Sequence, residues 1–418
     1  MKILHTVENY SESGGGMFEV VKQISEHLLE FGHEVTIASN RHALTGSLNK
    51  SKIKIRRFEI DGNDVRGYSS EKSVIEEYQK FLIESGFDVI TNFAAQQWAT
   101  DLTFPVLSRI NAKKVFVPTG FSGLFLPQYK DYFEKMRYWM TQYDMNVFLS
   151  HNYRDINFAR ENKIKNTCII PNGASAEEFS KPNDNDIRST LCIPRDHVLI
   201  LHVGSHTGHK GHKEAIQIFR ASRIKRATLL IIGNIVDAKC YKKCMFTSQA
   251  FNFREKIAGD PKYNLFKRRK KSNGFITDGV NKQILIMNLK RSDTVKAYHD
   301  ADLFLFPSNI ECSPIVLFEC AASGTPFLSS DAGNATEIAQ WTGGGMILPT
   351  IHKKNGFCTV NIRESAAMLE DVMADHVKRS EMANTSYQRW KENYSWEKIA
   401  MDYEHLYLDL MKNNDRKA

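Results

Sequence analysis

Two glutamates on either side of an expected helix start could bind the hydroxyl groups of a ligand. Glu311 follows an apolar stretch at 303–306, which is typical of a buried strand. Glu319 lies in the next expected helix, for which Ser313 is the predicted N-cap and Pro314 the predicted first residue. Because a helix N-terminus attracts phosphate and carboxylates accept hydrogen bonds from hydroxyls, a separation of about 7.5 Å along the helix suits a nucleotide sugar, with its sugar near Glu311 and its ribose near Glu319. Two solvated glutamates around a helix start are the competing interpretation.

The segment 204–212 has the composition of a phosphate-binding loop. It follows a predicted strand at 198–203 and precedes a predicted helix at 213–222, at the sheet edge where open α/β proteins bind ligands. Its glycines permit a close backbone approach, and Lys210 supplies positive charge for phosphate oxygens. The pattern differs from a Walker loop, because no Ser or Thr follows a Gly-Lys pair. A flexible connection explains the same pattern equally well.

A run of three glycines lies near the N-terminus. The motif Ser13-Gly14-Gly15-Gly16 follows the first predicted strand, at 3–7, and opens a predicted helix. Backbone N–H groups at such a helix start could face a phosphate or a sugar. A tight turn would need the same glycines.

Several metal-like motifs are better explained by structure. Asp300 and Asp302 join an expected helix end to a buried strand, so we do not expect them to bind a metal. Cys240 and Cys244 lack a second Cys/His pair at suitable spacing. The histidines within 206–212 are interpreted as polar lining of the loop. We therefore expect no metal site and no cofactor.

Helical patterns alternate with short apolar stretches along the chain, which predicts an α/β fold with parallel sheets. A polar stretch rich in Pro, Asn and Asp at 179–186 separates two such series. We expect two Rossmann-like domains facing a central cleft, with boundaries at 1–178 and 179–390, and a C-terminal segment at 391–418. The expected strands lie at 3–7, 35–38, 89–91, 114–117, 145–149 and 167–170 in the first domain, and at 198–203, 227–232, 283–287, 303–306 and 326–329 in the second.

The composition is that of a globular protein without a membrane span. The 418 residues carry 56 Lys plus Arg against 48 Asp plus Glu, a formal net charge of +8. The block 237–272 holds eleven basic and three acidic residues and accounts for the whole excess, so it is interpreted as an inserted basic patch for an anionic membrane, an acidic acceptor or a protein partner. No recognition motif accompanies it, which ranks nucleic acid lowest. Seven cysteines, an odd number, and the lack of an apolar run near 18 residues favour a soluble cytoplasmic protein.

Taken together, five motifs in order resemble one enzyme family. Glu311-x7-Glu319, Pro171-Asn172-Gly173, Lys210-Gly211, Ser323-Gly324-Thr325-Pro326 and the tail from Tyr394 to Ala400 are similar to those of the family 4 retaining glycosyltransferases of the GT-B fold. The resemblance covers the chain from Ile3 to about Met411. It implies that the C-terminal helix crosses back to the N-terminal domain.

The resemblance implies a role for each matching residue. Lys210 would neutralise the donor diphosphate, Glu319 would hold the ribose, and Glu311 would contact the donor sugar and assist a metal-independent transfer with retention. The donor, a UDP- or GDP-linked sugar, would be a substrate rather than a cofactor, and the acceptor a glycan or a lipid-linked glycan. The full set of implied donor-binding residues is Gly15, Gly16, Gly204, Ser205, Lys210, Ser313, Pro314, Ile315 and Glu319, and the acceptor side comprises Thr119, Gly120 and Phe121.

Two departures from the family pattern affect the expected chemistry. Ser205 stands near the position where family members often have an arginine, so a cation for the diphosphate is missing or supplied elsewhere. Thr119 stands where many have a histidine, and a threonine cannot act as a general base at neutral pH. These departures keep open a non-catalytic protein that binds glycans or nucleotide sugars. A GT-B epimerase or phosphorylase is the other alternative.

The segment 121–143 has eight aromatic side chains mixed with three basic ones. In similar enzymes this region borders the acceptor and can touch the membrane, which would place the protein at the inner face of the membrane. A packed helix with a solvated basic face is the alternative.

Overall fold

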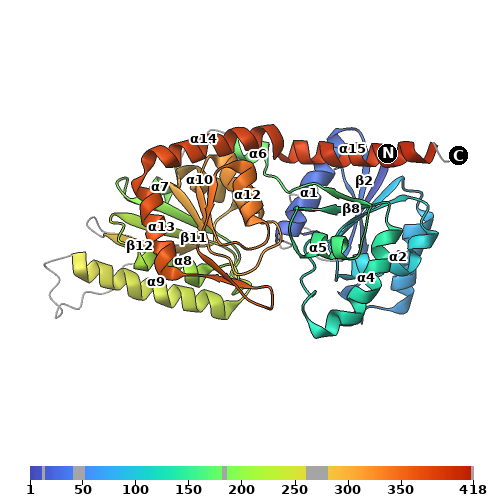
Figure 1. The fold of residues 1–418 in the computed structure, drawn as a ribbon, viewed down its shortest axis with the longest axis horizontal. Helices are drawn as coiled ribbons and strands as arrows, with labels where there is room; N and C mark the ends of the chain where they lie inside the picture. The colour runs from blue at the N-terminus through green and yellow to red at the C-terminus, as the bar shows by residue number, and fades with distance from the viewer. Residues whose placement is uncertain (12–14, 41–51, 181–185, 260–280, 416–418) are drawn as a thin grey trace. The chain divides into compact units, whose positions relative to one another are not determined.

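The structure is a computed structural model that describes residues 1–11, 15–40, 52–180, 186–259 and 281–415 (Figure 1). Its contacts divide the chain into two units. The first comprises Met1–Gly173, Cys312–Ile315 and Asn393–Ala418, and the second comprises Ala174–Glu311 and Val316–Glu392. The domain boundary expected between residues 178 and 179 stays a prediction, and the contacts divide the chain a few residues earlier. Parts of three predicted features, Ser13-Gly14, the linker at 181–185 and the basic run at 267–271, lie outside the described residues.

The first unit is built around a parallel sheet of seven strands in the order β3-β2-β1-β6-β7-β8-β9. Each neighbouring pair in this sheet is parallel. Its strands are β1 (Lys2–Thr6), β2 (Glu34–Asn40), β3 (Lys54–Phe58), β6 (Val89–Phe93), β7 (Lys113–Val117), β8 (Met145–Phe148) and β9 (Thr167–Ile169), and β4 (Asp61–Asn63) pairs with β5 (Gly67–Ser69) beside it. Its helices are α1 (Gly15–Glu30), α2 (Lys72–Glu84), α3 (Trp98–Asp101), α4 (Lys130–Gln142), α5 (Arg154–Glu161) and α15 (Trp396–Asp415), with short 3-10 turns at Phe104–Arg109 and Pro127–Tyr129.

The second unit has a parallel sheet of six strands in the order β12-β11-β10-β13-β14-β15. Its strands are β10 (Val198–Val203), β11 (Ala227–Ile232), β12 (Lys282–Met287), β13 (Leu303–Phe306), β14 (Phe327–Ser329) and β15 (Gly345–Ile347), and β16 (Thr350–His352) pairs with β17 (Cys358–Val360). Its helices are α6 (Ala176–Phe179), α7 (Ile187–Thr190), α8 (His212–Ala221), α9 (Ala238–Gly259), α10 (Arg291–Asp300), α11 (Ile315–Ser323), α12 (Ala335–Thr342), α13 (Ile362–Ala374) and α14 (His376–Asn393). Two sheets with this strand order confirm the predicted α/β class with two Rossmann-like halves.

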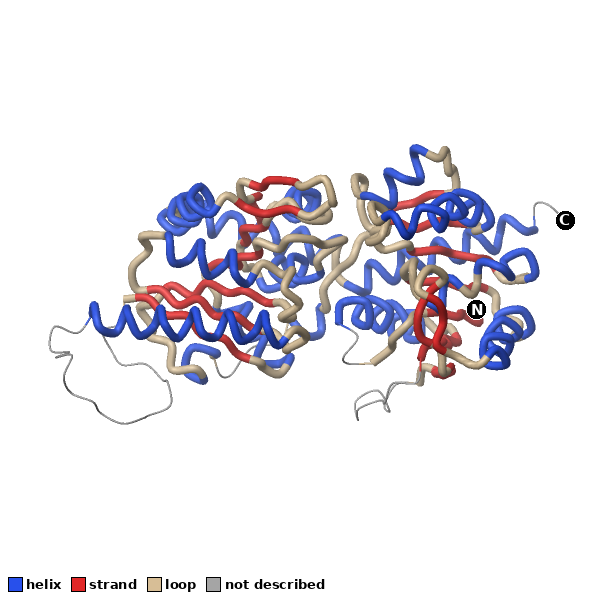
Figure 2. The backbone as a smooth tube through the Cα atoms, turned by 90° about the horizontal axis from the view of Figure 1, so that it is seen from below, coloured by secondary structure: helices blue, strands red, loops and turns tan. Residues whose placement is uncertain are grey.

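The block 237–272 was expected to be an insertion, and for its described part this is wrong. Helix α9 occupies Ala238–Gly259 and packs against β12, so it is the crossover helix between the parallel neighbours β11 and β12 (Figures 1 and 2). A parallel pair requires such a crossover. The basic residues obscured the helix because they occupy its solvent face, while Cys244 joins the core.

The C-terminal tail forms two helices rather than the single helix expected. Helix α14 ends at Asn393 and α15 begins at Trp396, and α15 packs along α1 in the first unit. Its apolar side chains, Trp396, Ile399, Tyr403, Tyr407 and Leu410, are buried in the same core cluster as the strands of the sheet. The hydroxyl of Tyr407 also lies 2.7 Å from that of Thr91 on β6. The tail is therefore an integral part of the first unit.

This packing predicts a large loss of stability when the first aromatic side chain of α15 is replaced by alanine. Trp396 is 1% exposed, so Trp396→Ala leaves a cavity and should lower the free energy of unfolding by about 3–5 kcal/mol. Leu408→Ala on the exposed side of the same helix should change it by less than about 0.5 kcal/mol. Urea denaturation of both variants measures the difference, and similar losses in the two would contradict the docking of α15.

Candidate functional site

The order of the second sheet brings two predicted loops to the same edge. Strands β10 and β13 are parallel neighbours, so the loops that follow them, 204–211 and 307–314, start at the same end of the sheet. The loops are also hydrogen bonded to each other. The backbone N–H of Asn309 donates to the carbonyl of His209 at 2.8 Å, and the Ser308 hydroxyl oxygen lies 3.1 Å from the same carbonyl oxygen.

Lys210 and Glu311, the two predicted catalytic residues, are in direct contact. The Lys210 Nζ lies 2.8 Å from both carboxylate oxygens of Glu311, and the Ser308 hydroxyl donates to Glu311 Oε1 at 2.7 Å. The Glu311 side chain is 7% exposed and that of Lys210 is 33% exposed. A carboxylate this buried needs a positive partner, and Lys210 provides it. Since an ammonium group has three N–H donors, Lys210 retains donor capacity toward a ligand on its more exposed side.

Two glycines shape the 204–211 loop around Lys210. Gly211 has φ of 75° at the N-cap of α8, and a methyl group there would overlap the carbonyl of Pro307. Only glycine satisfies both conditions. A Cβ on Gly204 would lie 3.2 Å from the Lys210 Cβ, so this glycine leaves room for the lysine side chain. Ser205, the next predicted donor residue, lies directly after Gly204 in the same loop.

Glu319 is held by an arginine that the sequence analysis missed. The Arg291 Nη2 lies 2.6 Å from Glu319 Oε1 and 2.7 Å from Glu178 Oε2, and the Glu319 side chain is only 5% exposed. Burial lowers the pKa of Arg291, but the Glu319 and Glu178 carboxylates outweigh it and raise the pKa above its usual value. The arginine therefore stays charged and neutralises Glu319.

A sequence signal for Arg291 did exist. It is the first residue of α10, directly after β12, at the positive end of a helix dipole where a cation is unfavourable. Such a cation needs a compensating anion, which Glu319 and Glu178 supply. Tyr298 lies on the same helix. Burial, and then the charge of Glu319, raises the pKa of its phenol well above its usual value.

The predicted capping role of Ser313 is wrong. Helix α11 begins at Ile315, so Pro314 precedes its first residue. The Ser313 hydroxyl is buried and has no hydrogen-bond partner among the described residues. The Ser313 hydroxyl was expected to accept a hydrogen bond from an N–H group of the helix. It makes no such bond, so Ser313 does not cap the helix. The N–H groups at the start of α11 therefore keep the anion-binding character that the sequence predicted.

The predicted residues of the first unit lie in two loops. Gly15, with φ of 65°, and Gly16 form the start of α1. Thr119, Gly120 and Phe121 follow β7, and all three have positive φ, at 56°, 98° and 47°. Two non-glycine residues in this conformation store strain, which is typical of functional loops.

Asp155, a residue that the sequence analysis did not select, fixes this strained loop. Its carboxylate accepts a 2.8 Å hydrogen bond from the Gly120 N–H. Burial raises the pKa of Asp155 from about 3.8 to about 6. Burial also raises the pKa of Asp101, which accepts a hydrogen bond from Tyr132, to about 7. Both carboxyl groups lie in the part of the unit where acceptor-side residues were expected.

Most of the aromatic segment 121–143 is packed. Phe121, Tyr132, Phe133 and Tyr143 are buried in one core cluster around α4, which favours the packed-helix alternative for them. Phe125, Leu126 and Tyr138 are exposed, at 52%, 44% and 64%.

The paired aspartates Asp300 and Asp302 have structural partners. Asp300 accepts from the Ile187 N–H at 2.6 Å, and Asp302 accepts from the Leu199 N–H at 2.8 Å and pairs with Arg188. These bonds join α7 to the start of β10. The aspartates therefore act within the fold, as the sequence analysis expected.

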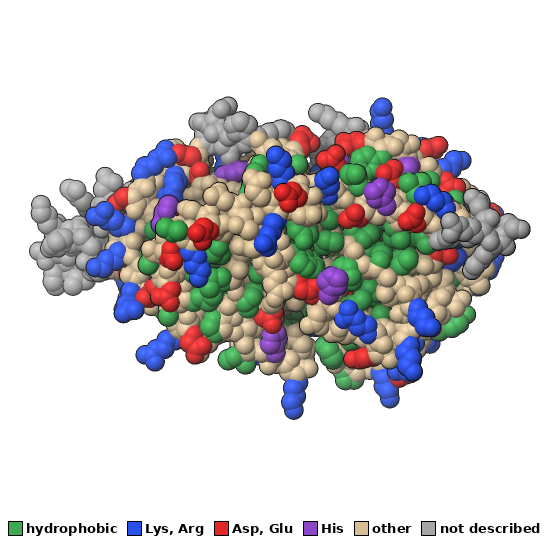
Figure 3. All heavy atoms as spheres, turned by 45° about the horizontal axis from the view of Figure 1, so that its top comes forward, with side chains coloured by type: hydrophobic (Ala, Val, Ile, Leu, Met, Phe, Trp, Pro, Cys, Tyr) green, Lys and Arg blue, Asp and Glu red, His purple; other side chains and the backbone are tan. Residues whose placement is uncertain are grey.

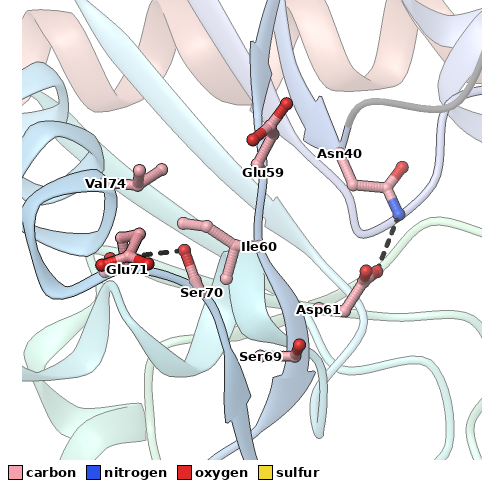
Figure 4. Close-up of a pocket in the computed structure, with 8 residues that line it drawn as sticks. All are labelled: Asn40, Glu59, Ile60, Asp61, Ser69, Ser70, Glu71 and Val74. Carbon is pink, nitrogen blue, oxygen red and sulfur yellow. Dashed lines mark hydrogen bonds between the residues drawn. The ribbon is translucent and has the colours of Figure 1, made fainter.

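A pocket of about 600 Å³ in the first unit contains none of the predicted site residues (Figure 4). It is lined by Asn40, Glu59, Ile60, Asp61, Ser69, Ser70, Glu71 and Val74, and Asn40 donates to Asp61 across one side of it. Three acidic side chains disfavour a phosphate ligand there. The pocket is thus unsuited to the chemistry of the two loops.

The buried carboxyl group of Asp155 predicts a pH dependence of stability. The folded chain keeps a proton that the unfolded chain releases between about pH 4 and 6, so the contribution of Asp155 to stability should be greatest below pH 4 and should be lost as the pH rises through 6. Asp155→Asn should remove a loss of about 3 kcal/mol from this interval. Thermal unfolding between pH 4 and 7 measures it, with the exposed Asp131→Asn as the control. The same pH profile in the Asp155 variant and the wild type would contradict the raised pKa.

Comparisons with known proteins identify the domain that carries these loops. Residues 183–389 match the model of a family described as glycosyl transferases group 1. None of the helices in the described ranges is long and apolar enough to cross a membrane.

Two sequence relatives and one solved structure show how far the similarity extends. An uncharacterized glycosyltransferase of Methanocaldococcus jannaschii is 24% identical over 417 residues, covering 95% of each chain. Lipopolysaccharide 1,2-N-acetylglucosaminetransferase of Salmonella typhimurium is 24% identical over 251 residues, and the match spans 59% of this chain and 56% of that protein. The Anabaena protein HepE, solved with UDP and glucose, is 13% identical with a TM-score of 0.70, covering 97% of this chain and 99% of HepE, which shows the GT-B fold. The chain therefore carries a group 1 glycosyltransferase domain at residues 183–389, which identifies it as a glycosyltransferase.

Proposed function

We propose that the protein transfers a sugar from a UDP- or GDP-linked donor to a glycan or lipid-linked acceptor, with retention of configuration and without a metal at the reacting atoms. The observation that carries this proposal is the contact of Lys210 with Glu311 beside Ser308. It puts a cation and a buried carboxylate together at the carboxyl edge of a parallel sheet, where ligands of this fold class bind.

Lys210 would stabilise the departing diphosphate. Negative charge grows on the leaving group in the transition state while the anomeric carbon becomes oxocarbenium-like. The partly exposed ammonium of Lys210 and the start of α11, which the Ser313 hydroxyl does not cap, are both suited to receive that charge. Positive charge from a lysine and a helix dipole could stabilise the leaving diphosphate here, as a bound divalent cation does in other transferases.

Glu311 would act on the donor sugar. Its carboxylate is oriented by Lys210 and Ser308 and is almost fully buried. When Lys210 turns toward a diphosphate, its charge no longer neutralises the Glu311 carboxylate. The carboxylate can then accept hydrogen bonds from the sugar hydroxyls and stabilise the positive charge that develops on the sugar. The two residues would therefore function as one unit.

Glu319 would hold the ribose, with Arg291 as a positioning residue. The Arg291 guanidinium engages Oε1 of Glu319 at 2.6 Å, which fixes the carboxylate plane. A fixed carboxylate binds vicinal hydroxyls with less loss of side-chain entropy.

Donor and acceptor assignments rest on the named relatives. HepE was solved in complex with UDP and glucose, which supports a UDP-sugar. The Salmonella relative is named for N-acetylglucosamine transfer to lipopolysaccharide, which supports a glycan on a lipid carrier. On the acceptor side, Thr119 lacks a basic nitrogen, so the acceptor hydroxyl would lose its proton to the leaving diphosphate rather than to this residue.

We further propose that α9 contacts an anionic membrane from the cytoplasmic side. Phe246 and Phe253 lie seven positions apart on this helix and are 76% and 59% exposed, among lysines at 239, 242 and 243. Exposed aromatic rings with neighbouring lysines suit a bilayer interface. On the face drawn in Figure 3, basic and acidic side chains of the described residues are interspersed and form no basic stripe.

The catalytic assignment predicts a selective loss of activity in one of two neighbouring lysine variants. Lys210→Ala should reduce donor turnover on the order of 100-fold, because it removes a charge that meets the leaving diphosphate. Lys213→Ala, an exposed lysine on α8, should leave turnover unchanged. Release of UDP or GDP from a panel of nucleotide sugars measures both. Equal turnover in the two variants would refute the assignment of the site.

The membrane assignment predicts weaker vesicle binding when the exposed rings of α9 are removed. The double variant Phe246→Ser, Phe253→Ser should co-sediment less with vesicles that contain phosphatidylglycerol, while its donor turnover stays near the wild-type value. Val377→Ser, which changes an exposed apolar side chain on α14, is the control. Vesicle binding unchanged by the double substitution would exclude α9 as the contact.

A further inference from the structure

A histidine and two cysteines, distant in sequence, meet beside the 204–211 loop. One ligand atom each from His206, Cys240 and Cys244 lies within 4.8 Å of the other two. The cysteines are four residues apart on α9, so they share a face of the helix. From the sequence alone, the cysteine pair does not predict a metal site, because no second Cys/His pair follows at suitable spacing. The third ligand comes instead from far upstream, through the fold.

The spacing of these atoms fits a tetrahedral cation. His206 Nδ1 lies 3.8 Å from the Cys240 sulfur. In a tetrahedral zinc site, bonds of about 2.3 Å to sulfur and about 2.0 Å to nitrogen place those two ligand atoms about 3.6 Å apart. The observed separation therefore needs a change of only a few tenths of an ångström.

The surroundings are those of a built site rather than of three adjacent surface groups. His206 has 0% relative exposure and Cys244 has 5%. The Nε2 of His206 has no hydrogen-bond partner among the described residues, although the atom is buried. The His206 ring stacks on that of His212 with centroids 4.1 Å apart, and Tyr241 covers its other side at 5.2 Å.

The chemistry of the donors favours a soft divalent cation, because imidazole nitrogen and thiolate sulfur are the ligands that such a cation prefers. On binding, the cation would displace the protons of both cysteines.

We propose that His206, Cys240 and Cys244 bind one Zn²⁺ ion, with water as the fourth ligand. On binding, two S–H bonds break, two Zn–S bonds and one Zn–N bond form, and two protons pass to solvent without any change of oxidation state. The ion links the loop that carries Lys210 to the first turns of α9. Its role is structural, and the transfer reaction involves no bond to it.

The test is a metal titration of the full-length chain, stripped with chelator and kept reduced by a phosphine. Co²⁺ should bind with a stoichiometry of one per chain and give the near-ultraviolet absorption of a cobalt–thiolate bond, and Zn²⁺ should displace it with release of protons. Cys240→Ser and Cys244→Ser should each lose this absorption. Cys192→Ser, which changes an exposed cysteine outside the cluster, should retain it.

The result is read from metal binding and not from turnover, so it is independent of the proposed transferase chemistry. No thiolate absorption with Co²⁺ in the wild type would overturn the proposal. Absorption that persists in both Cys240→Ser and Cys244→Ser would overturn it as well. Circular dichroism of each variant shows whether it is folded, and the Asn substitution of His206 provides a third ligand variant if either serine variant is not.

Discussion

The parallel pairing of β10 with β13 is the constraint on which the candidate site depends. In this register Ile200 lies beside Leu303 and Leu201 beside Phe304, so both strands end at the same edge of the sheet. The chain leaves that edge through the 204–211 loop on one strand and the 307–314 loop on the other. Lys210 and Glu311 are about one hundred residues apart in sequence and come together only because of this pairing.

A second constraint is that each of the two buried carboxylates of the candidate site is in contact with a cation. Glu311 has Lys210, and Glu319 has Arg291. Leaving either carboxylate unpaired in a desolvated position would cost several kcal/mol. The cations thus stabilise the ligand-free site and are already in place when a donor arrives. Such preorganisation is the main source of electrostatic catalysis in enzyme sites.

The sequence predicted the sheets, and it selected Lys210 and Glu311 one by one, because these depend on local patterns: apolar strands, glycine-rich loops and a helix start after a strand. It did not predict that the two side chains are in contact. It did not predict Arg291 as the partner of Glu319, since that contact depends on how α10 packs beside α11. For the same reason the sequence did not predict Cys240 and Cys244 as part of a metal site, because the third proposed ligand, His206, lies in another loop. The sequence also did not predict that the basic block forms the crossover helix α9, because the charged side chains on its solvent face mask the helical pattern.

The central claim is that Lys210 and Glu311 act as one unit toward the donor. A double-mutant cycle tests it most directly, with UDP affinity measured by calorimetry for Lys210→Ala, Glu311→Gln and the double variant. The account predicts that the two single effects differ from additivity by more than about 0.5 kcal/mol, because each substitution changes the partner available to the other. Additive effects within error would show that the two side chains act independently and would contradict the account.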